Sequence, residues 1–249
     1  MITHSYDIST PPITSPGMFY GARGDLCKTC IVTFSEQIFK HALEAFPHKQ
    51  IAEIGACNGN KPIYLLDTPA GKVAIYLSSI GATGAGNEVI ESSWITGAEN
   101  YIFFGSAGTL DSAKTRGRYV IPTAAYRDEG MSYHYAPPAD YIEMNGADIV
   151  AKVFDELRVP CVRGRVWTTD AFYRETRGQM EARRNEGCIA VEMELAGVQA
   201  VCDFHDLRLY AFLQAGDALD LPTYDFAGLP GANHDLEKFY LALEIAKRI

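Results

Sequence analysis

One stretch, residues 187–201, constrains the fold more than any other part of the chain. Its beginning, residues 188–191, is short and apolar and predicts a buried strand. Apolar residues then recur at the spacing of a helix, at Leu195, Val198 and Val201. Glu192 and Glu194 therefore lie where a strand ends and a helix begins, the place at which open α/β sheets bind their ligands. A structural role is equally open for this stretch alone, because acids in a first helical turn also complement the helix dipole.

The remainder of the chain alternates strand-like and helix-like segments, which predicts the α/β class. Further strands are predicted at residues 30–34, 51–57, 62–66, 72–77, 101–104, 161–166 and 207–213. Helices are predicted at residues 36–46, 88–96, 147–157 and 236–249, with Ser35 as the cap of the first. Residues 1–24 are rich in Pro, Gly, Ser and Thr and are predicted to form an irregular amino-terminal arm. We expect a single domain over residues 1–249, because 47% hydrophobic content at this length suffices for one large core.

Charge and composition limit the kinds of partner that we expect the protein to bind. A net charge of -9 without a cluster of Lys and Arg argues against nucleic acid. No apolar run approaches the roughly 20 residues of a membrane span, and residues 1–12 lack the basic and apolar regions of a signal peptide. We therefore expect a cytoplasmic protein that contacts no membrane. Cys27 and Cys30 form a CxxC pair, but no second pair follows, so no metal site is predicted.

Two further segments are candidates for binding. Residues 78–87 join a strand to a helix through a GxxGxG pattern, and backbone amides at such a turn can approach an anion. Glycines that only allow close helix packing are the alternative. Phe172 follows the predicted strand 161–166, and an aromatic ring just past a strand end can stack on a flat base.

Four strings, in this order, resemble the nucleoside phosphorylase superfamily, which includes purine nucleoside phosphorylases, uridine phosphorylases and nucleoside hydrolases. They are FGSAG at 104–108, IPTAAYRDEGMSYHY at 121–135, TTDAFYRET at 168–176 and VEMELA at 191–196. The resemblance runs from about Cys30 to about Asp217. It implies a single-domain three-layer α/β/α sandwich around a central mixed β-sheet, assembled as a homodimer or a trimer of dimers. It also implies a nucleoside and inorganic phosphate as substrates, and no cofactor.

The resemblance assigns roles to individual residues. Glu194, and more weakly Met193, would hold the ribose hydroxyls, beside Glu192. Phe172 would stack on the base, and Asp217 would be the catalytic acid that protonates a purine ring. The residues implied to lie toward phosphate are Gly81, Thr83, Gly105, Ser106 and Lys61, the last close to where uridine phosphorylases carry an arginine donated to the neighbouring subunit.

The chain also departs from the family pattern. Phe103 stands where the family has an arginine that clamps phosphate, and a bidentate arginine is the usual means of holding such a dianion. Thr176 and Gly178 stand where uridine phosphorylases carry a Gln and an Arg that read uracil. Gly216 replaces the serine that precedes the acid in purine-acting members.

These residues predict phosphorolysis of a nucleoside, with purine ahead of pyrimidine because of Asp217. Phe103 favours a different reaction, hydrolysis of the same bond by a nucleoside hydrolase that uses water. Uridine phosphorolysis and a nucleoside-binding module without turnover are also open. Retention of both Glu194 and Asp217 argues against the binding module.

Overall fold

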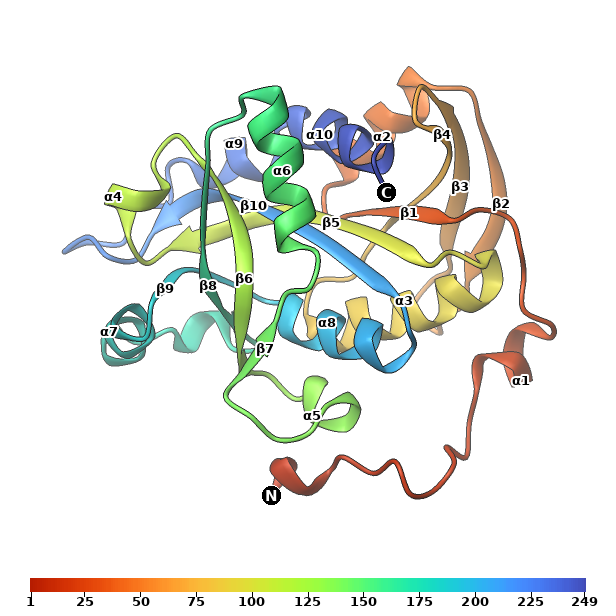
Figure 1. Cartoon of the computed structure of the whole chain (residues 1–249), viewed down its shortest axis with the longest axis horizontal. Helices are drawn as coiled ribbons and strands as arrows, with labels where there is room; N and C mark the ends of the chain where they lie inside the picture. Colours follow the sequence, from red (N-terminus) through yellow and green to blue (C-terminus); the bar gives the residue numbers. More distant parts are fainter.

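The computed structural model describes residues 1–249 and has a mixed β-sheet with helices on both faces (Figure 1). The strands are β1 Thr29–Thr33, β2 His48–Ile54, β3 Lys61–Thr68, β4 Gly71–Leu77, β5 Asn100–Thr109, β6 Tyr119–Asp128, β7 Tyr141–Glu143, β8 Cys161–Thr169, β9 Cys188–Glu192 and β10 Arg208–Ala218. The helices are α1 Pro16–Tyr20, α2 Glu36–Ala45, α3 Ala82–Thr96, α4 Ser112–Thr115, α5 Ser132–Tyr135, α6 Ala147–Leu157, α7 Arg177–Asn185, α8 Leu195–Phe204, α9 Leu229–His234 and α10 Glu237–Ala246, with short 3-10 turns at Ile2–His4 and Phe172–Arg174. The predicted α/β architecture around a central mixed sheet is confirmed.

The sheet runs in the order β10-β6-β8-β9-β5-β1-β4-β3-β2, and β7 pairs with β6. An additional parallel pairing joins β10 to β5, so that β5, β10, β6, β8 and β9 form a closed ring of strands. The strands β1 to β4 extend the sheet beyond this ring on one side. Closure of the ring brings the ends of β5, β9 and β10 beside one another.

Helices cover the sheet on both faces. In Figure 1, α2, α6 and α10 lie above the strands β1, β5 and β10, whereas α3 and α8 lie below them. One cluster of 52 buried residues fills the space between these layers. Aromatic rings form part of it, with Phe104 stacked on Phe212 at 5.6 Å between ring centroids. None of the helices has both the length and the apolar character that crossing a bilayer requires.

Strands β5 and β10 are longer than predicted. Their parallel register pairs residues from Asn100 to Thr109 with residues from Arg208 to Ala218. Gly105, Ser106 and Asp217 therefore lie inside strands rather than in the loops after them. The small and polar residues at these ends have weak strand propensity, and the hydrogen bonds to the neighbouring strand override it.

Helix α3 begins at Ala82, six residues before the predicted start at Glu88. Its glycines bring it close to its neighbours, since a methyl group added at Gly86 would lie 3.0 Å from Cε of Met131. On α8, a methyl group added at Gly197 would lie 2.8 Å from Cβ of Ala82. Close helix packing, the alternative interpretation of the glycine-rich segment, describes these contacts.

The prediction of an irregular amino-terminal arm is wrong for Pro16–Tyr20, which form α1. Proline is favoured in the first turn of a helix, and the turn packs against α3. Trp94 Nε1 donates a hydrogen bond of 2.9 Å to the carbonyl of Gly21, and Tyr20 donates one of 3.0 Å to Glu91. By contrast, α6 has the predicted bounds, and the predicted cap of α2 is present, since Ile38 N donates to Ser35 Oγ at 3.2 Å.

Candidate active site

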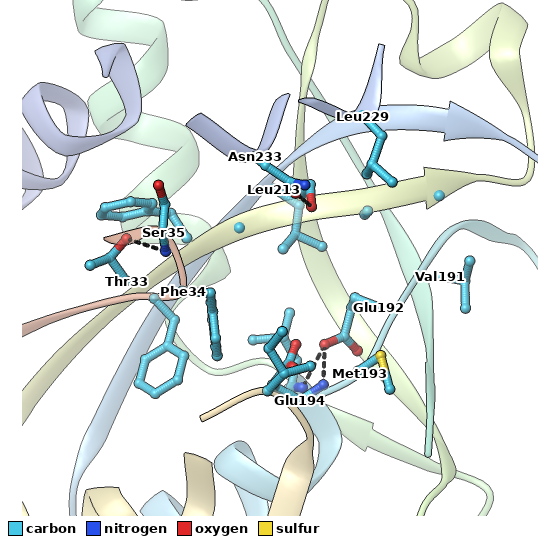
Figure 2. A pocket seen from close by; sticks show the side chains of 18 of the residues that line it. Thr33, Phe34, Ser35, Val191, Glu192, Met193, Glu194, Leu213, Leu229 and Asn233 are labelled. Carbon is cyan, nitrogen blue, oxygen red and sulfur yellow. Dashed lines mark hydrogen bonds between the residues drawn. The ribbon is translucent and has the colours of Figure 1, made fainter. Parts of the chain in front are cut away.

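A cavity of about 280 Å³ lies at the ends of β1, β5, β9 and β10, with α9 and α10 along one side (Figure 2). Most of the residues predicted to bind or act on substrate line it: Gly105, Ser106, Phe172, Glu192, Met193, Glu194 and Asp217. These residues come from segments that are far apart in sequence. The fold therefore brings the two predicted acids, Glu194 and Asp217, into one cavity.

Strand register places Asp217 close to β9, the strand that leads to Glu194. Gly108 of β5 pairs with Val191 of β9 on one side and with Asp217 of β10 on the other. A methyl group added at Gly108 would lie 2.9 Å from Val191 and 3.1 Å from Oδ2 of Asp217. Glycine at this position therefore leaves room between the two strands for the side chains of Val191 and Asp217.

Glu192 is buried, and both of its carboxylate oxygens accept hydrogen bonds from the protein. One carboxylate oxygen accepts from the hydroxyl of Thr168, and the other accepts from the backbone N–H groups of Glu194 and Leu195 at 2.7 Å each. Burial raises the pKa of Glu192, and the neighbouring charge of Glu194 raises it further. The structural role left open for this stretch describes these contacts, because Glu192 holds the amino terminus of α8 in place.

Glu194 is held from a different element. Its Oε1 accepts a hydrogen bond of 2.7 Å from the backbone N–H of Gly81, at the start of α3. Burial raises the pKa of Glu194, while this hydrogen bond opposes the rise. The carboxylate thus has a fixed orientation at the wall of the cavity, close to Glu192 and Met193 (Figure 2).

Asp217 is 7% exposed and accepts a hydrogen bond of 2.8 Å from the hydroxyl of Tyr224. Burial raises its pKa, although the bond from Tyr224 opposes the rise. Glu175 also lines the cavity, and burial together with the charge of Asp217 raises its pKa from 4.5 to about 7. Two carboxyl groups with raised pKa values therefore share this end of the cavity, as is common where an enzyme transfers protons.

Glu175 should make the stability of the protein depend on pH. Below about pH 4.5 the folded and the unfolded chain both carry the proton on Glu175, whereas between about pH 4.5 and 7 only the folded chain retains it. Ionisation then favours the unfolded chain, so stability is lost as the pH rises from about 4.5 to about 7. We expect Glu175→Gln to gain about 1 to 2 kcal/mol of unfolding free energy relative to the wild type between pH 4 and pH 8, allowing for the partial exposure of the side chain.

Urea denaturation at the two pH values measures this difference. The control is Glu181→Gln, which alters an exposed acid on the neighbouring helix α7. Parallel stability profiles for Glu175→Gln and the wild type would contradict the assignment.

Three of the predicted residues do not line this cavity. Gly81 is connected to the cavity only by the hydrogen bond that its N–H donates to Glu194. Thr83 is exposed in the first turn of α3. Lys61 lies 3.5 Å from Oε1 of Glu88 and donates to the carbonyl of Leu77 at 3.3 Å. Within one chain, Lys61 therefore does not supply the charge that Phe103 leaves missing, and its role across a subunit interface stays a prediction.

Other polar residues that the sequence did not single out for substrate also line the cavity, among them Ser35, Asn233, His234 and Lys238. Ser35 Oγ lies 2.8 Å from Nδ1 of His234, and Ser106 donates a hydrogen bond to Oδ1 of Asn233. Lys238 Nζ donates to the carbonyl of Ala232. One signal was present in the sequence, because Lys238 precedes Ala242 and Ile245 at helical spacing on the buried stripe of α10.

Residues 28–241 match the family model described as the phosphorylase superfamily. A relative, the DeoD-type purine nucleoside phosphorylase of Exiguobacterium sibiricum, is 28% identical over 155 residues, which cover 57% of this chain and 63% of that protein. The match thus spans less than two thirds of the length of this relative.

Solved structures share the fold. Purine nucleoside phosphorylase from Toxoplasma gondii in complex with immucillin-H superposes with a TM-score of 0.73 at 16% identity, covering 90% of this chain and 92% of that one. The 5'-methylthioadenosine/S-adenosyl homocysteine nucleosidase of Campylobacter jejuni gives a TM-score of 0.71 at 18% identity, covering 89% of this chain and 99% of that one. The match over residues 28–241 and the shared fold agree. This chain belongs to the phosphorylase superfamily.

Proposed function

We propose that this protein cleaves the N-glycosidic bond of a purine nucleoside, with inorganic phosphate as the acceptor of the sugar. The observation that carries the proposal is that Glu194 and Asp217 line one cavity. Phosphate as acceptor is supported by Ser106 in that cavity and by the relative from Exiguobacterium sibiricum, which is a purine nucleoside phosphorylase. The products would be a free base and ribose 1-phosphate.

Cleavage of the bond requires stabilisation of charge on both the sugar and the base. As the bond breaks, positive charge develops on the sugar and negative charge on the departing base. Glu194 is placed to bind the ribose hydroxyls and to favour an oxocarbenium-like sugar, as carboxylates do in glycosidases. Asp217, whose pKa is raised by burial, can deliver a proton to N7 of the base. Phe172, which is 39% exposed, lines the same cavity and can stack on the base.

The residues at the two positions that read uracil in uridine phosphorylases favour a purine nucleoside as the substrate of this protein. Thr176 caps α7 and forms a capping box with Gln179, and a side chain at Gly178 would meet open space. Neither residue lines the cavity, so neither can read the edge of uracil there. Uridine phosphorolysis is therefore less favoured than purine phosphorolysis.

Hydrolysis of the same bond is the second candidate, and the absence of arginine favours it. No arginine lines the cavity, and Phe103 contributes an aromatic wall where the family carries a phosphate clamp. The structural neighbour from Campylobacter jejuni is itself a nucleosidase. Water needs no cationic clamp, so these features suit it as the nucleophile.

One experiment separates these functions. The protein is incubated with inosine, adenosine and uridine, with and without phosphate, and free base is measured. We expect base release from the purine nucleosides that depends on phosphate. Release that is equal without phosphate would identify a hydrolase. Tight binding without release from any of the three would contradict cleavage altogether.

A further inference from the structure

We infer that Lys238 supplies the positive charge that binds inorganic phosphate in the cavity, in place of the missing arginine. The inference rests on the proposed function and deepens it, because it names the residue that would hold the acceptor. It arises from α10, an element outside the four strings that carry the family resemblance.

The burial of Lys238 is the first observation. Its side chain is 0% exposed and forms no salt bridge, and the nearby Asp235 opposes only part of the effect of burial on its pKa. Its hydrogen bond goes to the neutral carbonyl of Ala232, which leaves the remaining ammonium protons free for another acceptor. A buried charge without a counter-ion is costly, so proteins usually pair it or use it to bind a ligand.

Arg127, the other buried cation, shows the contrast. Its guanidinium donates to Ser132 Oγ and to the carbonyls of Ala136 and Pro137. It also lies over the ring of Tyr133, at 4.3 Å from the centroid, and it does not line the cavity. The hydrogen bonds of Arg127 are thus satisfied inside the protein, whereas Lys238 lines the cavity with a single hydrogen bond and with only the nearby charge of Asp235 to balance its own.

The surroundings of Lys238 suit an oxyanion. Ser35, Ser106, Asn233 and His234 line the same cavity with neutral or basic groups that can donate hydrogen bonds. Figure 2 shows Ser35 and Asn233 across the cavity from Glu194. An anion bound on this side is therefore separated from the carboxylate that would hold the sugar.

Apolar residues around Lys238 strengthen its attraction for a bound anion. Phe34, Ile38 and Phe103 form part of the cavity wall, and an apolar wall lowers the local dielectric constant. The same burial lowers the pKa of Lys238 to about 8. The ammonium group is therefore mostly charged at pH 7 and loses its charge above about pH 8, while a bound anion would favour the charged form.

The test measures anion binding in the absence of nucleoside. Titration calorimetry compares phosphate binding to the wild type, Lys238→Met, Lys61→Met and Lys247→Met. Methionine keeps the length of the stem and removes a buried charge, so Lys238→Met should fold, which its thermal denaturation will check. Lys247 lies near the end of the same helix, is exposed and pairs with Glu244, so it is the matched control.

We expect phosphate to bind the wild type and Lys247→Met with similar affinity, and Lys238→Met about 10- to 100-fold more weakly. Equal affinity for Lys238→Met, or a loss confined to Lys61→Met, would overturn the inference. A second arm compares the wild type with Lys238→Met and uses sulfate, whose charge stays constant over the range. Glu175, Glu192 and Glu194 line the same cavity with raised pKa values, so their ionisation also weakens anion binding in both proteins. Sulfate affinity should fall more steeply between pH 7 and pH 9 in the wild type than in Lys238→Met, and parallel profiles would also overturn the inference.

The two proposals can fail separately. Phosphate binding that requires Lys238, without base release from any nucleoside, would contradict the proposed cleavage alone. Base release that depends on phosphate in the wild type and persists unchanged in Lys238→Met would contradict the role of Lys238 alone.

Discussion

Replacement of Asp217 by asparagine is expected to slow base release from a purine nucleoside by about 100- to 10,000-fold, the usual contribution of a positioned general acid. Asparagine keeps the shape of the side chain and still accepts the hydrogen bond from Tyr224, but it cannot release a proton to the base. The loss should therefore appear in kcat, with a smaller change in KM. Steady-state kinetics with inosine and adenosine measure it.

Two controls make this result specific. Asp225→Asn removes an exposed acid of the loop that follows β10 and should leave base release unchanged. A nitrophenyl riboside, whose leaving group needs no proton, should be cleaved by Asp217→Asn at close to the wild-type rate. Full activity of Asp217→Asn on inosine would remove Asp217 from the mechanism.

Replacement of Glu194 by glutamine is expected to lower kcat/KM for nucleosides by about 10- to 150-fold, which corresponds to the loss of about 1.5 to 3 kcal/mol for a hydrogen bond to a charged group. The glutamine oxygen can still accept from Gly81 N, so the local fold should persist. Its amide group cannot favour positive charge on the sugar as a carboxylate does. The effect should exceed this range if the hydrogen bonds to the ribose tighten only in the transition state.

Substrates without ribose hydroxyls test the contact directly. The values of kcat/KM for the wild type and Glu194→Gln should differ much less on a dideoxynucleoside than on the matching ribonucleoside. With the dideoxynucleoside, neither protein can form the hydrogen bond to the ribose hydroxyls that the variant loses. An equal loss on both substrates would show that Glu194 does not act through the ribose hydroxyls.

The motif strings were sufficient for the family and the fold class. The string VEMELA predicted a strand followed by a helix, and β9 and α8 occur there. It also placed two acids at the joint between them, but it did not distinguish their environments. Glu192 caps α8 through two backbone N–H groups, whereas Glu194 faces the cavity, bound to Gly81 on another helix. Only the tertiary contact from Gly81 separates the two.

Local patterns were less informative where partners come from far along the chain. Gly105, Ser106 and Asp217 were expected after strands, but the pairing of β5 with β10 extends both strands through them. The glycines of α3 fit an anion-binding turn as well as a packed helix, and the contact that connects Gly86 with packing comes from Met131 on another segment. A pattern of neighbouring residues contains no information about such partners.

The sequence by itself thus determined the α/β class and the family, and it singled out Glu194 and Asp217 as candidates, because each of these inferences depends on short strings of neighbouring residues. The tertiary structure alone decided which other groups join them. Glu175 and Lys238 line the cavity because closure of the strand ring and the packing of α10 bring distant segments together. Burial then shifts their pKa values, and burial is a property of the assembled fold and not of any stretch of sequence.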